Sequence, residues 1–413
     1  MITKWGVTNF KSIREADLDL APLTVFTGVN SSGKSSFLDS ILMAAQLPDE
    51  RFKLNPYNIQ LGEVKHIFHN HASGLSSIDY DFIIDDLLIN FSLMPYNSET
   101  YITETNTMKV ENLKVYEKIE DLEELERDDE HERYQELYEE PCDWDDEHEA
   151  FLEIYNNRKT FLKDVFSLKN FRYLGPFRDP SQFSNKKDDE CVNSDGSNTF
   201  AVLNKLYKEN KNVPYCFPDQ IEKKKYVSTF IETFGFWIKH FEIADTCKVD
   251  DNGELKFYKD REEYTLQQLG SSVSQIMPIF GMCIPAPIGS TIIIKEPEVH
   301  LHPKTQSYLA DFFVEMALSG RQCLIETHSE YLVEQLRYNI VMLSDRKPEP
   351  LHIITKMYFV TKEAGVSQYK DIVIDENASL DDWPDDFFDE THKIIRKMTE
   401  AIAKKEELDE END

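Results

Sequence analysis

The sequence predicts an α/β fold with a mixed sheet, into which an acidic helical arm is inserted. Three observations support this prediction. A glycine-rich loop at 28–36 lies between a short apolar run and a segment with apolar residues at helical spacing. Two more apolar runs, at 291–294 and 322–326, flank another helical pattern, the order expected for parallel strands. Between these halves, residues 117–153 hold 19 Asp or Glu but only three Lys or Arg, which is typical of a solvated insertion.

The glycine-rich loop fits the phosphate-binding pattern G-x-x-x-x-G-K-S/T. The run at 23–27 predicts a buried strand before it, and 37–43 predicts a helix after it. Glycines let such a loop wrap an anion, and the free N–H groups at the helix start point toward it. We therefore expect ATP to bind here, with Lys34 at the β- and γ-phosphates and the hydroxyl of Ser35 on Mg²⁺. The predicted nucleotide-binding residues are Asn30, Ser31, Ser32, Gly33, Lys34, Ser35 and Ser36.

The 413 residues divide by pattern and composition into five parts. Residues 1–110 hold the phosphate loop, and the strand–turn–strand pattern of the first 20 residues predicts an antiparallel flank on the nucleotide-binding sheet. The other parts are the acidic arm at 111–160, a lateral region of helices and a hairpin at 161–264, the second half of the nucleotide-binding domain at 265–391, and a C-terminal helix with an acidic tail at 392–413. The arm is either a solvated insertion or a docking element for a basic partner.

Charge and cysteine spacing limit the class of protein. A formal charge of −32 argues against a protein that coats nucleic acid with its whole surface. The lysines at 205, 208, 211 and 223–225 form either a solvated face or a local contact to nucleic acid. The six cysteines include no C-x-x-C pair, which suits a reducing cytoplasm and indicates neither a zinc site nor a disulfide framework. Residues 276–294 carry no charge over about the length of a bilayer crossing. Their prolines and glycines instead favour a helix, a loop and a buried strand, so no membrane partner is expected.

Polar residues follow directly after both of the later strands. In a parallel sheet, the carboxyl ends of the strands form the edge where ligands bind. We therefore expect these residues to complete the site that the phosphate loop begins. The polar groups are Lys295-Glu296-Pro297-Glu298 after the first strand, Thr327-His328-Ser329 after the second, and Gly270-Ser271-Ser272 at the start of a predicted helix upstream.

This set of motifs resembles the ATP-binding-cassette-like (ABC-type) ATPases of the overcoming-lysogenization-defect group, which are relatives of the structural-maintenance-of-chromosomes (SMC) ATPases. The resemblance covers about residues 1–70, 165–180 and 265–391, and leaves the acidic arm outside. It implies an ABC-type P-loop NTPase with a mixed sheet. Besides the motifs above, it rests on Asn9-Phe10-Lys11-Ser12, Leu174-Gly175-Pro176-Phe177-Arg178, His300-Leu301-His302-Pro303 and the box Trp383-Pro384-Asp385-Asp386-Phe387-Phe388-Asp389-Glu390.

The resemblance also implies a role for each polar group. Glu296 matches the carboxylate that polarises the attacking water, and His328 matches a contact to the γ-phosphate. Gly270, Ser271 and Ser272 match the signature that contacts ATP bound to a second protomer, where a helix N-terminus favours phosphate. ATP would then hold two protomers together.

One residue departs from the family pattern. The acid that holds Mg²⁺ through water should precede Glu296, but Lys295 stands there, and a lysine cannot ligate a metal. Either hydrolysis is slow, so that ATP links protomers for a long time, or Glu296 or Glu298 takes over the metal. Glu298 is therefore a third candidate catalytic residue. Gln46 and Gln60 are both candidates for the glutamine that usually contacts Mg²⁺.

The expected function is that of an ATP hydrolase that dimerises or oligomerises around ATP and gates a partner effector in bacterial defence against phage, in the cytoplasm. Members of the group with their own nuclease carry a further domain, for which the 85 residues after His328 are too few. The effector, such as a nuclease, is therefore expected to be a separate protein. Two alternatives stay open: an SMC-like ATPase of DNA repair or recombination, and a nucleotide-binding scaffold with little hydrolysis.

Overall fold

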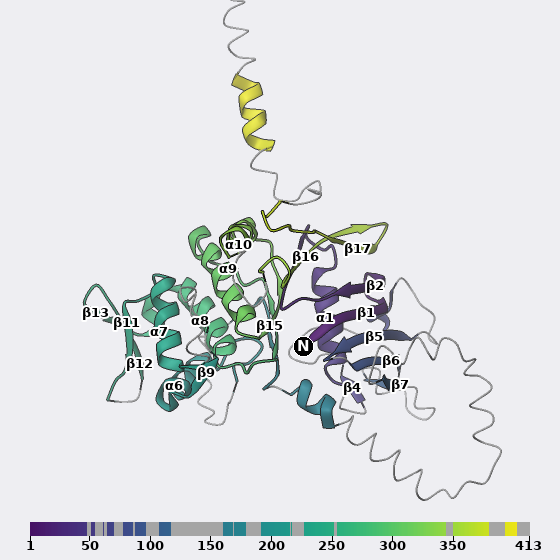
Figure 1. Ribbon diagram of the computed structural model, residues 1–413, viewed down its shortest axis with the longest axis horizontal. Coiled ribbons are helices and arrows are strands. Elements are labelled where there is room, and N and C mark those ends of the chain that lie inside the picture. The colour runs from purple at the N-terminus through teal and green to yellow at the C-terminus, as the bar shows by residue number, and fades with distance from the viewer. Residues whose placement is uncertain are drawn as a thin grey trace, which may run out of the picture.

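The computed structural model places two six-stranded sheets and a group of helices around two clusters of buried apolar side chains (Figure 1). The residues that the structure describes are 1–47, 51–53, 61, 64–69, 77–85, 87–95, 107–116, 160–167, 169–178, 191–214, 216, 227–251, 254–343, 350–379 and 393–402.

The first six-stranded sheet carries the phosphate loop. Its strand order is β17-β16-β3-β15-β14-β8. β15 (Gln322–Glu326) pairs in parallel with β3 (Leu23–Gly28) on one side and with β14 (Thr291–Lys295) on the other, so the carboxyl ends of these three strands lie side by side. The other strands are β8 (Phe171–Leu174), β16 (Thr355–Glu363) and β17 (Val366–Asp371). Of the six, only β17 is antiparallel, which confirms the predicted mixed sheet.

A second, antiparallel sheet packs against α1 (Lys34–Ala44), the helix that follows the phosphate loop (Figure 1). One buried cluster joins Phe37 of α1 to Trp5 of this sheet and to Phe26 of the first sheet, so the helix is buried from both sides. Contrary to the prediction from the sequence, β1 and β2 do not join the nucleotide-binding sheet, because β1 pairs with β2 on one side and with β5 on the other. In the sheet order β2-β1-β5-β6-β7-β4, the strands are β1 (Ile2–Phe10), β2 (Ile13–Asp19), β4 (Arg51–Lys53), β5 (Ile78–Ile84), β6 (Leu87–Pro95) and β7 (Thr107–Tyr116), and the short helix α2 (Val64–Ile67) precedes β5.

Helices cover the opposite face of the first sheet (Figure 1). The second buried cluster joins Ile292 and Ile325 of that sheet to Phe280 of α8 (Ser271–Cys283) and Phe312 of α9 (Pro303–Leu318). The other elements in this part of the molecule are α6 (Thr199–Glu209), α7 (Phe230–His240), α10 (Glu330–Leu343), the strands β9 (Asn212–Pro214), β10 (Val227–Thr229), β11 (Thr246–Val249), β12 (Leu255–Lys259) and β13 (Glu262–Tyr264), and the 3₁₀ helix η3 (Leu266–Leu269).

Several boundaries predicted from the sequence can be compared with the structure. The uncharged stretch at 276–294 consists of the end of α8, a loop and most of the buried strand β14, as predicted. Within the described ranges, no helix combines the length and the apolar character that a bilayer crossing needs. β7 continues to Tyr116, past the boundary predicted at residue 110, because its residues pair with β6. The acidic arm from 117 to 159, the lysines at 223–225 and the box at 383–390 lie outside the described residues.

We predict that any side chain at Gly28 destabilises the fold. Its φ of 134° strongly favours glycine, and an added Cβ would overlap the backbone carbonyl of Val360, its partner on β16. Gly28→Ala should lower the melting temperature in a thermal unfolding scan by roughly 2–6 °C, since such strain costs on the order of 1–3 kcal/mol.

Gly235→Ala is the matched control, because nothing lies within 4 Å of a Cβ added at that position in α7. Alanine stabilises a helix interior by about 0.5–1 kcal/mol relative to glycine, so this variant should melt slightly higher than the parent. Equal melting temperatures for Gly28→Ala and the parent would contradict the close approach of the two strands.

Candidate nucleotide-binding site

The phosphate loop leaves β3 and ends at the first turn of α1. Gly33, at the start of the helix, has a φ of 113°, and Ser31 has a φ of 60°, so both adopt positive-φ conformations that turn the chain back toward the helix. The helix has no side-chain cap and no acidic residue in its first turn, which leaves its N–H groups and positive dipole for an anion. β17 holds the loop in place: the hydroxyl of Ser367 donates to the carbonyl of Ser32 (2.6 Å) and that of Tyr369 to the carbonyl of Gly33 (2.9 Å).

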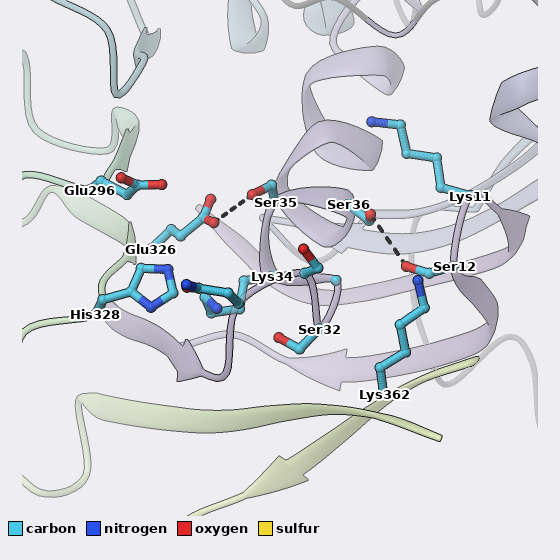
Figure 2. A pocket seen from close by; sticks show the side chains of 13 residues that line it. Lys11, Ser12, Ser32, Lys34, Ser35, Ser36, Glu296, Glu326, His328 and Lys362 are labelled. Atoms are coloured by element: carbon cyan, nitrogen blue, oxygen red, sulfur yellow. Dashed lines mark hydrogen bonds between the residues drawn. The ribbon is translucent and has the colours of Figure 1, made fainter. Parts of the chain in front are cut away.

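A cavity of about 730 Å³ lies at this loop. Figure 2 shows that Glu296, Glu326 and His328 approach it from one side. Lys11, Ser12 and Lys362 approach from the other side, and loop residues 30–36 lie between the two groups. Pockets for small ligands typically enclose roughly 300–1,000 Å³, so the volume suits a nucleotide. The cavity thus brings together all seven predicted nucleotide-binding residues and two of the three candidate catalytic residues.

The ammonium of Lys34 is held inside the loop. Its Nζ donates to the carbonyl oxygens of Gly28 (2.9 Å) and Val29 (2.7 Å). Burial lowers the pKa of Lys34, and the carboxylates of Glu326 and Glu296 oppose that effect. Since a charged phosphate is a stronger acceptor than a carbonyl, this ammonium is placed to exchange its loop contacts for contacts to a phosphate.

Two groups of predicted site residues do not line the cavity. Glu298 is buried, and its carboxylate accepts the backbone N–H of His328. Burial raises the pKa of this carboxyl in spite of that hydrogen bond. Gly270 and Ser271 are exposed at the start of α8, and the hydroxyl of Ser272 donates to a backbone carbonyl (3.2 Å). These three residues are not among those that line the cavity.

The backbone at Glu296 is held in an unfavourable conformation. Its φ of 47° lies in the left-handed region, which costs a residue with a side chain about 1–2 kcal/mol. The guanidinium of Arg178 donates to the carbonyls of Lys295 (2.8 Å) and Glu296 (2.9 Å), and the N–H of Glu296 donates to the carbonyl of Glu326 (2.7 Å). Burial lowers the pKa of Arg178 to about 10, so it stays charged at neutral pH. Arg178 also accepts a hydrogen bond from Gln275 of α8 through its carbonyl (3.2 Å), and so joins that helix to the Glu296 turn.

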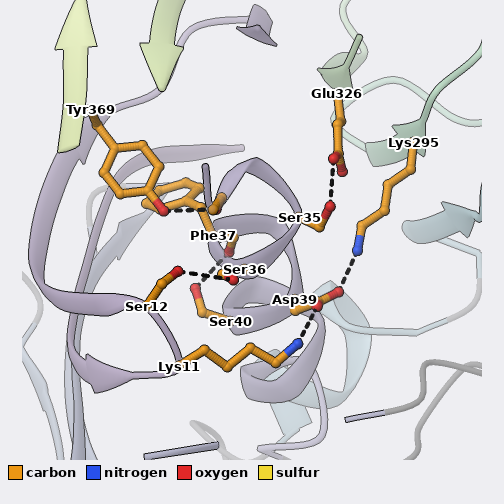
Figure 3. A network of polar contacts seen from close by, with 11 residues as sticks. Lys11, Ser12, Ser35, Ser36, Phe37, Asp39, Ser40, Lys295, Glu326 and Tyr369 are labelled. Carbon is orange, nitrogen blue, oxygen red and sulfur yellow. Dashed lines mark hydrogen bonds and ion pairs between the residues drawn. The ribbon is translucent and has the colours of Figure 1, made fainter. Parts of the chain in front are cut away.

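Two polar contacts join α1 to the ends of β15 and β14 (Figure 3). The hydroxyl of Ser35 donates to the carboxylate of Glu326, and Asp39, one turn later, forms an ion pair with Lys295. Asp39 also accepts from Lys11 (2.7 Å). Burial alone would raise the pKa of Asp39, but the two lysines outweigh it and hold the pKa below its ordinary value. Lys295 is therefore paired with Asp39 and does not present an unpaired charge to a bound Mg²⁺. Its presence alone gives no reason to expect slow hydrolysis.

Glu326 and Asp39 are site residues that the sequence analysis missed. Glu326 directly precedes the Thr-His-Ser motif, so its position at a strand end is the signal that could have revealed it. Asp39 gives no comparable signal, because its partner Lys295 lies 256 residues away. The same holds for Lys362, which β16 brings to the cavity from a region without a recognised motif.

The structure also defines the environment of His328 and Gln46, two further residues that the sequence analysis named. Burial, followed by the charge of Lys34, lowers the pKa of His328 below its ordinary value of 6.5. Its imidazole is therefore mainly neutral at pH 7 and keeps one N–H to donate. Gln46 follows the end of α1, where its amide contacts Met43, and it does not line the cavity. Gln60, the other candidate, lies outside the described residues.

Solved structures resemble this fold. The structure of an SMC head bound to the C-winged helix domain of ScpA covers 91% of this chain and 98% of its own, with a TM-score of 0.50 and 12% identity. The SMC head domain from Thermotoga maritima covers 90% of this chain and 98% of its own, with a TM-score of 0.41 and 12% identity. At such low identity the likeness concerns the fold alone. No curated protein matches the chain.

Two family profiles match the sequence. Residues 354–398 match a family described as a protein of unknown function (DUF3696). The profile described as an AAA ATPase domain matches residues 1–333, most of the chain, and includes the phosphate loop, Glu296 and His328. The chain therefore belongs to the AAA ATPase domain family, on a fold that it shares with SMC heads.

Proposed function

We propose that this ATPase closes around ATP as a dimer or higher oligomer, and that closure controls a partner protein. The observation that carries this proposal is the exposed start of α8, which lies outside the cavity of its own protomer. Gly270 supplies no side-chain cap there, and the first turn holds no acidic residue. The helix start is therefore suited to the γ-phosphate of ATP bound to a second protomer.

Within each cavity, four residues have distinct tasks in the proposed hydrolysis. Lys34 moves from the loop carbonyls to the β- and γ-phosphates, and Ser35 holds Mg²⁺, which neutralises phosphate charge when bound. Glu296 orients and polarises the attacking water. His328 donates a hydrogen bond to the γ-phosphate through an imidazole N–H. Ser271 and Ser272 complete the site from the neighbouring protomer.

The partner is proposed to be a separate effector, such as a nuclease, acting in bacterial defence against phage in the cytoplasm. The resemblance of the motifs to the overcoming-lysogenization-defect group supports this, as an analogy at the level of the family. An SMC head of similar fold is bound to a domain of ScpA, so a head of this kind can carry a partner protein. The formal charge of −32 disfavours the alternative of an ATPase whose main partner is DNA.

Ser271→Arg tests the proposed assembly. A long cationic side chain at the start of α8 should block the close approach of a second protomer but leave ATP binding to one protomer intact. We expect the ATP-dependent increase in mass seen by light scattering to disappear. Phosphate release should fall by at least roughly 10²-fold, because the whole contact from the second protomer is lost and one preorganised donor alone contributes that much.

Ser271→Ala is the matched control, because it removes the hydroxyl but keeps the backbone N–H groups; it should still assemble. Lys34→Ala should lose ATP binding itself, which separates a nucleotide defect from an assembly defect. An oligomer that ignores ATP, together with unchanged turnover in Ser271→Arg, would contradict the proposed assembly.

A second prediction concerns Arg178. Arg178→Met removes the hydrogen bonds that hold the Glu296 turn, so phosphate release should fall by about 10–100-fold, because small displacements of a reacting group have effects of that size. Nucleotide affinity should change little, because Arg178 does not line the cavity. Arg172→Met is the control: that arginine is also buried and donates to backbone carbonyls, but not to the Glu296 turn. Equal loss of turnover in both variants would show a general effect on stability.

A further inference from the structure

One face of α1 meets two charged residues at the ends of neighbouring strands. Ser35 and Asp39 are four residues apart, so they lie one above the other on the helix. Lys295 and Glu326 are register partners on the parallel strands β14 and β15. The helix presents Ser35 to Glu326 and Asp39 to Lys295 (Figure 3). The carboxylate that meets the loop serine is therefore on β15, whereas the family pattern expects an acid at the end of β14.

The surroundings of Glu326 are those of a cation ligand. Its side chain is only 2% exposed, yet it lines the cavity beside Ser35. One carboxylate oxygen accepts the Ser35 hydroxyl, and in the described part of the chain the other, Oε2, has no hydrogen-bond partner. A buried carboxylate oxygen is unfavourable unless a donor or a cation meets it. Carboxylate and hydroxyl oxygens are among the ligands that Mg²⁺ takes together with phosphate oxygens.

Asp39 explains why a lysine stands at position 295. Asp39 and Lys295 are 4% and 5% exposed, and each is the other's nearest opposite charge. An acid at position 295 would meet Asp39 as a like charge in a buried place. Lysine instead forms an ion pair there, and Lys11 adds a second cation to Asp39. The pair thus neutralises the end of β14, so that Glu326 at the end of β15 supplies the negative charge beside Ser35.

We propose that Glu326 is the carboxylate that holds the Mg²⁺ of bound ATP together with Ser35, either directly or through a bound water. The Asp39–Lys295 pair stands at the end of β14, where the family resemblance implies that acid. This assignment rests on the proposed function, in that it requires Mg²⁺ and ATP to occupy the cavity. It replaces the two interpretations drawn from the sequence, in which the metal passes to Glu296 or Glu298 or hydrolysis is slow.

The test compares the affinity for a fluorescent ATP analogue in Mg²⁺ and in EDTA, with the full-length protein. Glu326→Gln keeps the size of the side chain and its contact to Ser35 but removes the charge. We expect this variant to bind the analogue in EDTA at least as well as the parent. The increase in its affinity on adding Mg²⁺ should be at least about tenfold smaller than that of the parent. Electron paramagnetic resonance of Mn²⁺ with the unlabelled nucleotide should show the same loss of bound metal.

Two sets of variants make the result decisive. Glu296→Gln and Glu298→Gln change the other two carboxylates and should keep the full gain with Mg²⁺. The double variant Asp39→Asn, Lys295→Met replaces the pair by neutral groups and should also keep it. If Glu326→Gln kept the gain while Glu296→Gln or Glu298→Gln lost it, the assignment would be overturned. If the parent bound no nucleotide in either condition, the proposed function would fail instead.

Discussion

The contact of one face of α1 with the ends of β14 and β15 holds the phosphate loop in its place at the edge of the sheet. The ion pair between Asp39 and Lys295 is buried, and removing one partner of such a pair typically costs about 3–5 kcal/mol. One turn earlier, the same face meets Glu326 through Ser35. With the helix fixed to the sheet at two heights, the phosphate loop that begins it cannot slide along the strands. The position of the loop relative to Glu296 and His328 follows from that constraint.

The side of the cavity that contains Glu296 is held separately from the loop. Arg178 fixes the left-handed turn at Glu296 through backbone carbonyls, and its own carbonyl accepts from Gln275 of α8. The helix whose exposed start is proposed to meet a second ATP is therefore in direct contact with the residue that holds Glu296. This gives a physical route by which closure of two protomers could act on the catalytic carboxylate. In the proposed assembly, the contact between Gln275 and Arg178 would couple closure to Glu296 without contact to the nucleotide.

The sequence predicts those parts of the site that local pattern determines. The strand, loop and helix around Lys34 have their signals within about twenty consecutive residues, and the strands at 291–294 and 322–326 were recognisable from their apolar runs. The sequence could not show that β1 and β2 join a separate sheet, because the pairing of β1 with β5 depends on partners more than 70 residues away. Lys295 appeared as a defect for the same reason. Its ion-pair partner Asp39 and the position of β15 between β3 and β14 are set by the fold, and neither is visible in a linear pattern.

The most direct test of this arrangement is a crystal structure with Mn²⁺ and a non-hydrolysable ATP analogue, in which anomalous scattering locates the metal. We expect the anomalous peak at about 2.0–2.2 Å from the hydroxyl oxygen of Ser35, with Glu326 as the protein carboxylate next to it and Lys295 still paired with Asp39. A metal coordinated by Glu296 or Glu298 would contradict the assignment of the metal-holding carboxylate to Glu326 at the end of β15. A Lys295 ammonium turned from Asp39 to a phosphate would contradict it as well.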